Sequence, residues 1–495
     1  MTTAASDISG LAALEQRLTA VGHHLLDGSA PVDGDDPAAV CDVLLARMVE
    51  SVMEAPTQDR IWLLLVGLTA TFPTDDEVLA AQRHLEVDSV SGALRWLLDQ
   101  AFAVAMSHGS GAHRVRVVRD TVVDVDFTAK HDLQTGIQRV VRSLVPRWHR
   151  DHGVEIAVWT EGAGALREPV ADERERVLRW QRPLGRFTVP PAQPVVVVPW
   201  RATLVLPEVP GIAQSRRLVS LAAHSPNRVV LVGYDCIPVV SADLLPIAEP
   251  TRFAQFLAVV KHSDVVAAIS DSAAREFRGF VHALPTQGLP GPEVTSCCLP
   301  FERPSAAGDD AGRVQEAEPE VLVVGSHDPR KNHLAVLHAS EVLWRQGMRF
   351  TLRLLGSGGW TTRAFDRQVE ELRKAGRPVL VERGMEDDHL WAAYRNARFS
   401  VLTSFHEGFG LPVAESLAAG TPAIVSGYGA LAETAAGGGA LLVDPRDDAA
   451  LIDAMRLLLT DDDALAQLRR EAQGRTSRSW DDYARELWAI TKGAR

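Results

Sequence analysis

The chain has 495 residues, and its 46% hydrophobic and 23% charged residues are typical of a globular protein of two or three domains. Its 64 acidic and 51 basic side chains give a formal charge of −13, which argues against a nucleic acid as the main partner because phosphates are repelled. The 4 cysteines form no C-x-x-C pair and indicate a reducing compartment. The first residues lack the basic and apolar regions of a signal peptide, so we expect a cytoplasmic protein.

Residues 1–112 are predicted to be helical. Apolar residues recur at three- and four-residue spacing in AAVCDVLLARMVESVM and in SGALRWLLDQAFAVAM. Between these segments, Pro73, Thr74 and Asp75 precede EVLAAQRHL, which is an N-terminal capping pattern. The region contains no recognisable catalytic or ligand-binding motif. We expect a packing or docking module, through which the chain could contact an oligomer or another partner.

Residues 113–301 show a different period and predict a first α/β domain. Short β-branched runs, beginning with an opening strand in VRVVRDTVVDVDFT, alternate with apolar helical segments such as GIQRVVRSLVPRW. Strands that alternate with helices favour parallel βαβ units. The polar stretch 302–320, ERPSAAGDDAGRVQEAEPE, is the best candidate for a linker.

Residues 321–475 predict a second and more regular α/β domain. Six near-continuous apolar runs are expected as buried parallel strands: EVLVVG, FTLRLLG, PVLVERG, FSVLTS, TPAIVSG and ALLVDP. Residues 476–495 contain the amphipathic helix SWDDYARELWAI. Two open α/β sheets in tandem would face a cleft at the carboxyl ends of their strands, where such sheets bind ligands.

The segment FSVLTSFHEGFGLPVAESLAAGTPAIVS carries the main candidate site. A loop with two glycines joins a strand to a short helix, and Pro412 suits the start of that helix. The backbone amides of residues 408–411 would then bind an anion at the helix N-terminus. Glu407 and Glu415 flank this position with acceptor-only carboxylates, which suits a ligand with central phosphates and hydroxyls at both ends. A nucleotide sugar is such a ligand; the four amide positions are Gly408, Phe409, Gly410 and Leu411.

The nonapeptide EGFGLPVAE resembles the E-x7-E signature of the retaining glycosyltransferases of the GT-B fold, the group 1 or family 4-like enzymes. The resemblance implies two Rossmann-like domains facing a cleft. It implies that Glu407 contacts hydroxyls of the donor sugar and that Glu415 contacts the ribose. The following LAAGTPAIVSGYGALAE, which ends at Glu433, is also similar to this family.

A second match lies in VLVVGSHDPRKNHLAVLHA, which resembles the donor-phosphate loop of the same family. Arg330 and Lys331 stand where a loop meets a helix, and such cations would neutralise a departing diphosphate. Many members carry arginine directly after the glycine, where this chain has Ser326. Arg330 is therefore expected to supply the guanidinium.

The acceptor side of the resemblance lies in the first α/β domain. Gly136, with Thr135 and Gln138 beside it, matches a glycine loop that faces the donor diphosphate. The segment YDCIP resembles an H-D-x-x-P element in which Tyr234 replaces the usual histidine, so a proton-handling role there is in doubt. Asp235 is the expected acceptor-side residue, with a purely structural role as the alternative. The resemblance covers roughly residues 120–440.

Three other readings are weaker. Asp124 and Asp126 form a D-x-D, but they lie in the expected opening strand, without a second acidic cluster, so no metal site is predicted. No G-x-G-x-x-G opens a βαβ unit, which argues against a dinucleotide enzyme. The arginine-rich stretch 174–187 is expected as a solvated face with packed arginine stems, and a membrane or lipid-linked acceptor contact is the alternative.

The sequence therefore predicts a glycosyltransferase that moves a hexose, with a mannose-like sugar favoured, from a nucleotide diphosphate sugar to a hydroxyl of a cell-surface glycan or glycolipid. Retention of configuration and independence from metals and other cofactors follow from the resemblance. Two alternatives stay open: a nucleotide-sugar epimerase or hydrolase on the same fold, and a non-catalytic sugar-nucleotide-binding subunit. A peripheral position at the inner membrane face is compatible with a lipid-linked acceptor.

Overall fold

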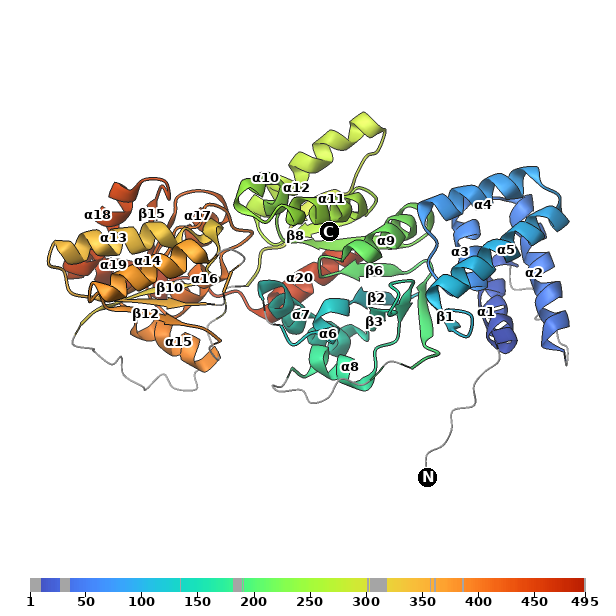
Figure 1. The fold of residues 1–495 in the computed structure, drawn as a ribbon, viewed down its shortest axis with the longest axis horizontal. Helices are drawn as coiled ribbons and strands as arrows, with labels where there is room; N and C mark the ends of the chain where they lie inside the picture. The colour runs from blue at the N-terminus through green and yellow to red at the C-terminus, as the bar shows by residue number, and fades with distance from the viewer. Residues whose placement is uncertain are drawn as a thin grey trace, which may run out of the picture.

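The computed structural model describes residues 10–26, 36–133, 135–180, 189, 191–300, 302, 318–356, 358–359, 362–384 and 387–493. Three parts follow one another along the long axis of the molecule, with the helical region at one end and the second α/β domain at the other (Figure 1). The helical region contains α1 (Gly10–Leu25), α2 (Pro37–Glu54), α3 (Gln58–Thr69), α4 (Asp75–Val87) and α5 (Val90–His108). The capping pattern before α4 is confirmed, because the Thr74 amide donates to the Glu77 carboxylate at 2.7 Å.

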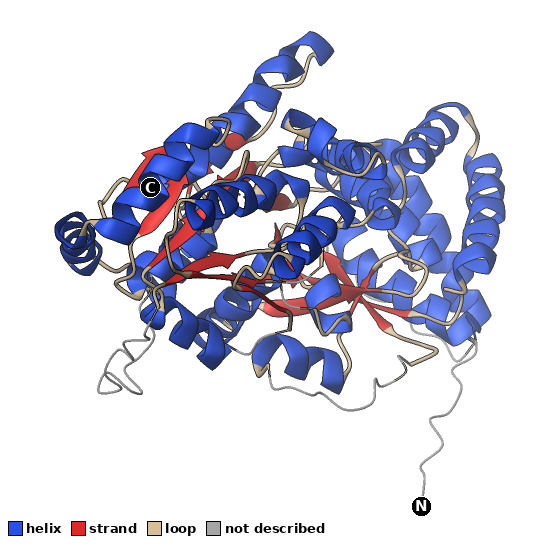
Figure 2. Ribbon diagram, turned by 60° about the vertical axis from the view of Figure 1, so that its left-hand side comes forward, coloured by secondary structure: helices blue, strands red, loops and turns tan. Residues whose placement is uncertain are grey.

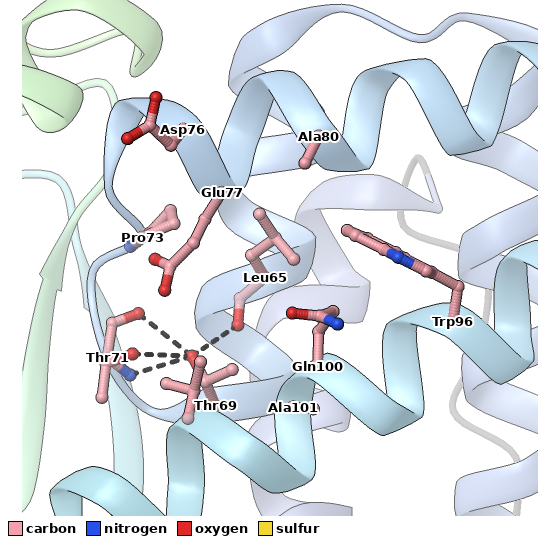
Figure 3. A pocket seen from close by; sticks show the side chains of 11 residues that line it. Leu65, Thr69, Thr71, Pro73, Asp76, Glu77, Ala80, Trp96, Gln100 and Ala101 are labelled. Carbon is pink, nitrogen blue, oxygen red and sulfur yellow. Dashed lines mark hydrogen bonds between the residues drawn. The ribbon is translucent and has the colours of Figure 1, made fainter.

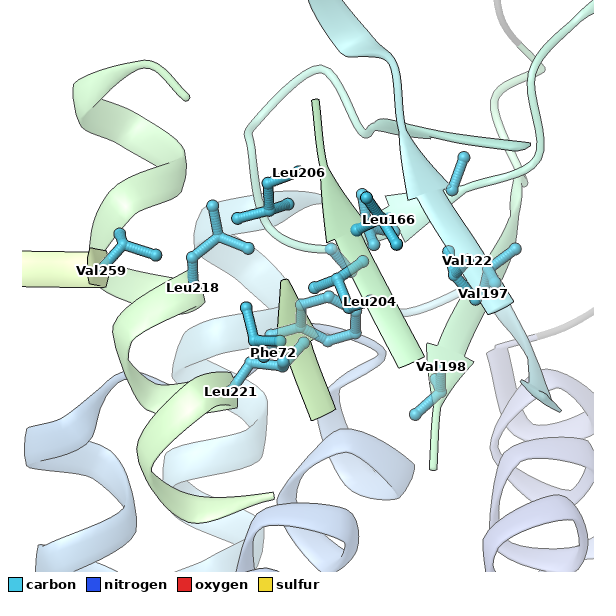
Figure 4. Packing of buried hydrophobic residues seen from close by; sticks show 14 of the residues in the cluster. Phe72, Val122, Leu166, Val197, Val198, Leu204, Leu206, Leu218, Leu221 and Val259 are labelled. Carbon is cyan, nitrogen blue, oxygen red and sulfur yellow. The ribbon is translucent and has the colours of Figure 1, made fainter. Parts of the chain in front are cut away.

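The helical region shares its hydrophobic core with the first α/β domain. Phe72 is fully buried, and its ring centroid lies 5.4 Å from that of Trp62 in α3 and 5.9 Å from that of Trp159 in the first sheet. Figure 4 shows Phe72 among Leu204 and Leu221 of the α/β domain. The described residues between 10 and 112 therefore pack as part of the first α/β domain rather than as a separate module.

The first α/β domain is built on a nine-stranded sheet in the order β1-β5-β4-β3-β2-β6-β7-β8-β9, in which only β4 runs antiparallel to its neighbours. Its strands are β1 (Arg114–Val118), β2 (Thr121–Asp124), β3 (Glu155–Trp159), β4 (Leu166–Arg167), β5 (Val195–Pro199), β6 (Thr203–Leu206), β7 (Arg228–Gly233), β8 (Val265–Ala268) and β9 (Glu293–Ser296). Its helices are α6 (Asp126–Lys130), α7 (Gly136–His152), α8 (Ala171–Leu178), α9 (Ile212–His224), α10 (Ile237–Val240), η1 (Ala242–Leu244), α11 (Ala248–Val260), α12 (Asp271–Ala283) and η2 (Leu284–Gln287).

The expectation of one opening strand was wrong. VRVVRDTVVDVDFT forms two strands, β1 and β2, and three other strands lie between them in the sheet. The charged pair Arg119-Asp120 separates the two runs, so the chain leaves the sheet edge at β1 and re-enters at the centre. Asp126 begins α6, so the two aspartates do not share one face of a strand.

The second α/β domain has six parallel strands in the order β12-β11-β10-β13-β14-β15, and all six expected strands are present. They are β10 (Glu320–Val324), β11 (Thr351–Leu355), β12 (Val379–Glu382), β13 (Phe399–Leu402), β14 (Ala423–Ser426) and β15 (Ala440–Val443). The helices are η3 (Pro329–Lys331), α13 (His333–Arg345), α14 (Arg363–Lys374), α15 (Asp387–Asn396), α16 (Leu411–Ala418), α17 (Gly429–Ala435), α18 (Asp448–Thr460) and α19 (Asp462–Gln473). Helices cover both faces of the sheets, which explains the near-continuous apolar strands (Figure 2).

The C-terminal helix α20 (Trp480–Lys492) returns to the first α/β domain. It packs against α7, β6 and β8, and Figure 1 shows it beside α7, away from the second sheet. The Trp148 indole N–H of α7 donates to the carbonyl of Ala484 at 2.9 Å. The chain thus crosses between the two domains twice; most of the expected linker 302–320, residues 303–317, lies outside the described part of the chain.

Candidate active site

The loop between β13 and α16 brings Glu407 against two cations from the end of η3. One carboxylate oxygen of Glu407 lies 2.5 Å from Lys331 Nζ, and the other lies 2.9 Å from an Arg330 guanidinium nitrogen. β10 and β13 are neighbours in the sheet, so the loops that follow their carboxyl ends meet at the topological switch point. The structure therefore brings together the three predicted residues Glu407, Arg330 and Lys331.

These three side chains form a largely desolvated charge cluster. Burial tends to raise the pKa of Glu407, but Arg330 and Lys331 outweigh it and hold that pKa at about 2. Burial lowers the pKa of Lys331, and Glu407 opposes this effect. The pKa of Arg330 is raised by Glu407 in spite of its own burial. At neutral pH, Glu407 is an ionised hydrogen-bond acceptor beside a net positive pair.

The two glycines of the motif are required by close contacts. A Cβ on Gly408 would lie 2.5 Å from the carbonyl oxygen of Tyr234, and Gly410 has φ +100° with Leu431 2.5 Å from its hypothetical Cβ. The hydroxyl of Ser270 donates to the Gly408 carbonyl at 2.6 Å. The loop therefore packs directly on the first α/β domain, and Leu411 begins α16.

Glu415 lies one turn inside α16 and is 7% exposed. The phenol of Tyr394 donates to its Oε2 at 2.9 Å. Its Oε1 accepts from Arg139, which comes from α7 of the first α/β domain. Gly136 is the first residue of α7 rather than part of a glycine loop, and its hypothetical Cβ lies 3.5 Å from a methyl group of Leu411. The N-termini of α7 and α16 therefore meet at the domain junction.

Asp235 follows β7 in the chain and lies next to Gly408. Burial raises its pKa to about 6, while the Arg330 charge lowers it and Glu276 raises it. The backbone amide of Ile237 donates to its Oδ1 at 3.1 Å. Tyr234, the residue in place of histidine, is buried and donates its hydroxyl to the Pro207 carbonyl at 2.8 Å, so it has a structural role here.

Sequence reasoning missed two residues of this region. His406 stands next to Glu407 and contacts Ser241 at 2.8 Å and Glu276 at 2.7 Å, so its imidazole joins the two domains. Arg139 lies within the GIQRVV helix. Its position three residues after Gly136 was the only feature of the sequence that pointed to it. The contacts of both residues depend on how the two domains are placed, which a linear sequence does not specify.

Glu433, the last residue of the motif region, also crosses the junction. Its carboxylate accepts from the backbone amides of Asp271 at 2.8 Å and Ser272 at 2.9 Å. These amides belong to the first turn of α12 in the first α/β domain. Glu433 therefore caps a helix of the opposite domain and holds α17 against it.

The D-x-D pair has a structural environment. Asp124 is buried and accepts from the Trp159 indole N–H at 2.8 Å, and burial followed by the Asp126 charge raises its pKa to about 8. Asp126 pairs with Lys130 at 2.7 Å. Within the described residues, no group of three or more His, Cys, Asp or Glu side chains is arranged to hold a metal ion.

Two other features lie away from these motifs. In the described part of 174–187, Arg176 is buried and bonds to Asp132, as expected for a packed arginine stem, and residues 181–187 lie outside the described ranges. A pocket of about 220 Å³ lies between α3, α4 and α5, lined among others by Thr69, Glu77 and Trp96 (Figure 3). Among the described helices, none is long and apolar enough to cross a bilayer.

Known proteins resemble this chain in the sequence of its second α/β domain and in its fold. Residues 309–475 match the family described as glycosyl transferases group 1. The described fold matches the Anabaena protein Alr3699/HepE, solved with UDP and glucose, with a TM-score of 0.54 and 12% identity over 76% of this chain and 100% of that one. Residues 309–475 are therefore similar to the group 1 glycosyltransferases, and the described fold is that of GT-B enzymes.

Three other proteins are similar to this chain in fold or in sequence. The sucrose-phosphate synthase of Thermosynechococcus elongatus aligns with a TM-score of 0.52 and 17% identity over 76% of this chain and 99% of that one, which bears on the fold alone. The serotype-specific mannosyltransferase WbdA of Escherichia coli is 25% identical over 404 residues, 73% of this chain and 46% of that protein. An Escherichia coli O-antigen chain mannosyltransferase B is 33% identical over 164 residues, 32% of this chain and 42% of that protein. The chain spans less than half the length of these curated relatives.

Proposed function

We propose that this chain transfers a hexose from a nucleotide diphosphate sugar to a hydroxyl of a glycan or glycolipid acceptor, with retention of configuration and without a required metal. The observation that carries the proposal is the desolvated cluster of Glu407, Arg330 and Lys331 beside the N-terminus of α16. An anion site next to an ionised hydroxyl acceptor is the arrangement that a sugar diphosphate needs.

In the proposed reaction, the bond between the anomeric carbon and the diphosphate oxygen breaks as a bond to the acceptor oxygen forms. The acceptor proton passes to an oxygen of the departing diphosphate on the same face of the sugar, so no side chain acts as a covalent nucleophile. Arg330, Lys331 and the amides of 408–411 stabilise the developing negative charge. Glu407 orients the sugar hydroxyls, and Asp235 accepts a hydrogen bond on the acceptor side.

A mannose-like donor is favoured because the mannosyltransferases WbdA and O-antigen chain mannosyltransferase B are among the relatives of this chain. The same likeness favours a cell-surface polysaccharide, or its lipid-linked precursor, as the acceptor. The nucleotide is tested directly by thermal shift with GDP-mannose, UDP-glucose, GDP and UDP, because a ligand that binds only the folded state raises its melting temperature. A protein that responds to none of these four would count against the donor site.

Donor turnover with and without acceptor then separates the proposal from its alternatives. A transferase consumes the donor only when a hydroxyl acceptor is present, whereas an epimerase or hydrolase on this fold converts the donor alone. A protein that binds the nucleotide sugar but converts it under neither condition would be a binding subunit. Turnover in excess EDTA should stay near its untreated value, and a loss that Mn²⁺ or Mg²⁺ restores would refute metal independence.

A further inference from the structure

We infer that Arg139, a residue of the acceptor-side domain, is a positioning residue of the donor site that holds Glu415 for the ribose of a nucleoside diphosphate. The inference rests on the proposed function, because it takes the ribose contact of Glu415 from that proposal. It adds a residue from the opposite domain to a nucleotide site whose other expected groups lie mainly in the second domain.

Glu415 lies in a buried environment at the domain junction. This carboxylate is 7% exposed, and it accepts from Tyr394 on one oxygen and from Arg139 on the other. An ionised carboxylate that is buried without a cation is energetically costly. When it is paired with a cation, it keeps about four acceptor positions that neighbouring hydroxyls can use. Arg139 therefore keeps Glu415 in the form that accepts hydrogen bonds from the two hydroxyls of a ribose.

The position of Arg139 is itself fixed by its helix. It lies in the first turn of α7, where the Gln138 side chain accepts from the Thr135 amide at 3.3 Å and closes a capping box. A Cβ built on Gly136, at the start of that turn, would lie 3.5 Å from a methyl group of Leu411, so the helix approaches α16 closely. The capped turn fixes the direction in which the guanidinium crosses the junction.

The two domains together orient Glu415 for a bound nucleotide. Glu415 is held between Tyr394 of its own domain and Arg139 of the other. The carboxylate is therefore oriented toward the ribose only when the two domains are together. Removal of Arg139 leaves the backbone of both domains intact but releases the carboxylate. The binding of the nucleoside diphosphate should then weaken, while groups at the bond that breaks are unaffected.

The experiment measures the binding of GDP and UDP to the full chain by calorimetry, using whichever nucleotide binds the wild type. Arg139→Ala should weaken binding by about tenfold to a hundredfold, the range for losing a hydrogen bond to a charged group. Arg139→Lys, which keeps the charge but not the fork geometry, should recover part of the loss. Arg147→Ala is the matched control, because Arg147 lies on the same helix and pairs with Asp481 at 2.7 Å, away from the site.

Two further readouts separate positioning from a structural effect. The Michaelis constant for the donor should rise in Arg139→Ala with little change in kcat, and the melting temperature should shift no more than in the Arg147 control. In a double-mutant cycle, Arg139→Ala should add little in a Glu415→Gln background, since it acts through that carboxylate. Equal binding by wild type and Arg139→Ala, or additive effects, would overturn the inference. A wild type that binds neither nucleotide would instead overturn the proposed function, and the inference with it.

Discussion

Lys331→Ala is the substitution that tests the candidate site most directly. The Lys331 side chain is 10% exposed, and its ammonium lies 2.5 Å from Glu407. The substitution removes one of the two cations that we expect to face the departing diphosphate, while Arg330 stays 2.9 Å from the other carboxylate oxygen. The charge of Glu407 therefore keeps a partner in the variant.

The expected effect of the substitution on stability is smaller than its expected effect on turnover, and this difference makes the test informative. Breaking a buried ion pair and leaving a bare charge costs roughly 3–5 kcal/mol of stability. Arg330 remains, and the desolvation cost of the buried ammonium disappears, so we expect a loss of only about 1–2 kcal/mol, well under that range. A group aimed at developing charge lowers the activation barrier by about 2.7–4 kcal/mol. Without Lys331, turnover should therefore fall by about a hundredfold to a thousandfold.

The assay is steady-state kinetics with the nucleotide sugar that the binding screen identifies, with thermal melts as the folding control. Lys374→Ala is the matched control: it removes the same charge from the same domain, and its ammonium is exposed and pairs with Glu370 on α14. Turnover in that control should equal the wild-type value. A folded Lys331→Ala protein that keeps near-normal turnover would show that the diphosphate leaves from elsewhere.

Three other predictions follow from the same structure. Glu415→Gln should raise the donor Michaelis constant about tenfold with kcat nearly unchanged, since the ribose is remote from the reacting bond; steady-state kinetics showing a fall in kcat alone would contradict this. Burial raises the pKa of Asp235 from 3.8 to about 6, so its folded carboxyl holds a proton more tightly than the unfolded one. The free energy of unfolding of the wild type should therefore fall, relative to Asp235→Asn, as pH rises from about 4 to about 6, and parallel urea-unfolding curves for the two proteins across that range would be evidence against it. Phe72→Ala should cost about 3–5 kcal/mol in urea unfolding, whereas Phe102→Ala, on the exposed face of α5, should stay within about 0.5 kcal/mol, and similar values for the two would mean that the shared core is absent.

The second α/β domain could be predicted from sequence because its signals are local. Each buried parallel strand is a continuous apolar run, and Glu407 and Lys331 lie in the segments that follow two such runs, which pair in the sheet. The first domain was harder. β4 has only two residues and runs antiparallel, and β1 and β2 merged into one apparent strand because two charged residues are a weak interruption.

The partners of the site residues could not be predicted for a different reason. Arg139 and Glu415 are separated by 276 residues, and His406 and Ser241 by 165. Such contacts depend on the relative placement of two domains, which neither periodicity nor a short motif determines. Glu433 illustrates the point: the motif drew attention to it, but its role as a cap for α12 depends on the opposite domain.

The contacts across the junction also indicate how the distant helical region can influence the site. The loop between β13 and α16 is held by the first domain at Gly408, through Ser270 and the backbone of Tyr234, and Glu415 inside α16 is held through Arg139. The same domain shares one hydrophobic core with α1–α5, and Phe72 lies inside it. A change that loosens this core therefore acts on the loop between β13 and α16 through these contacts, even though Glu407 and Lys331 themselves lie beyond residue 320. For this reason we expect a chain that begins at residue 113 to lose the packing of its first domain, and with it the close approach of α7 to α16.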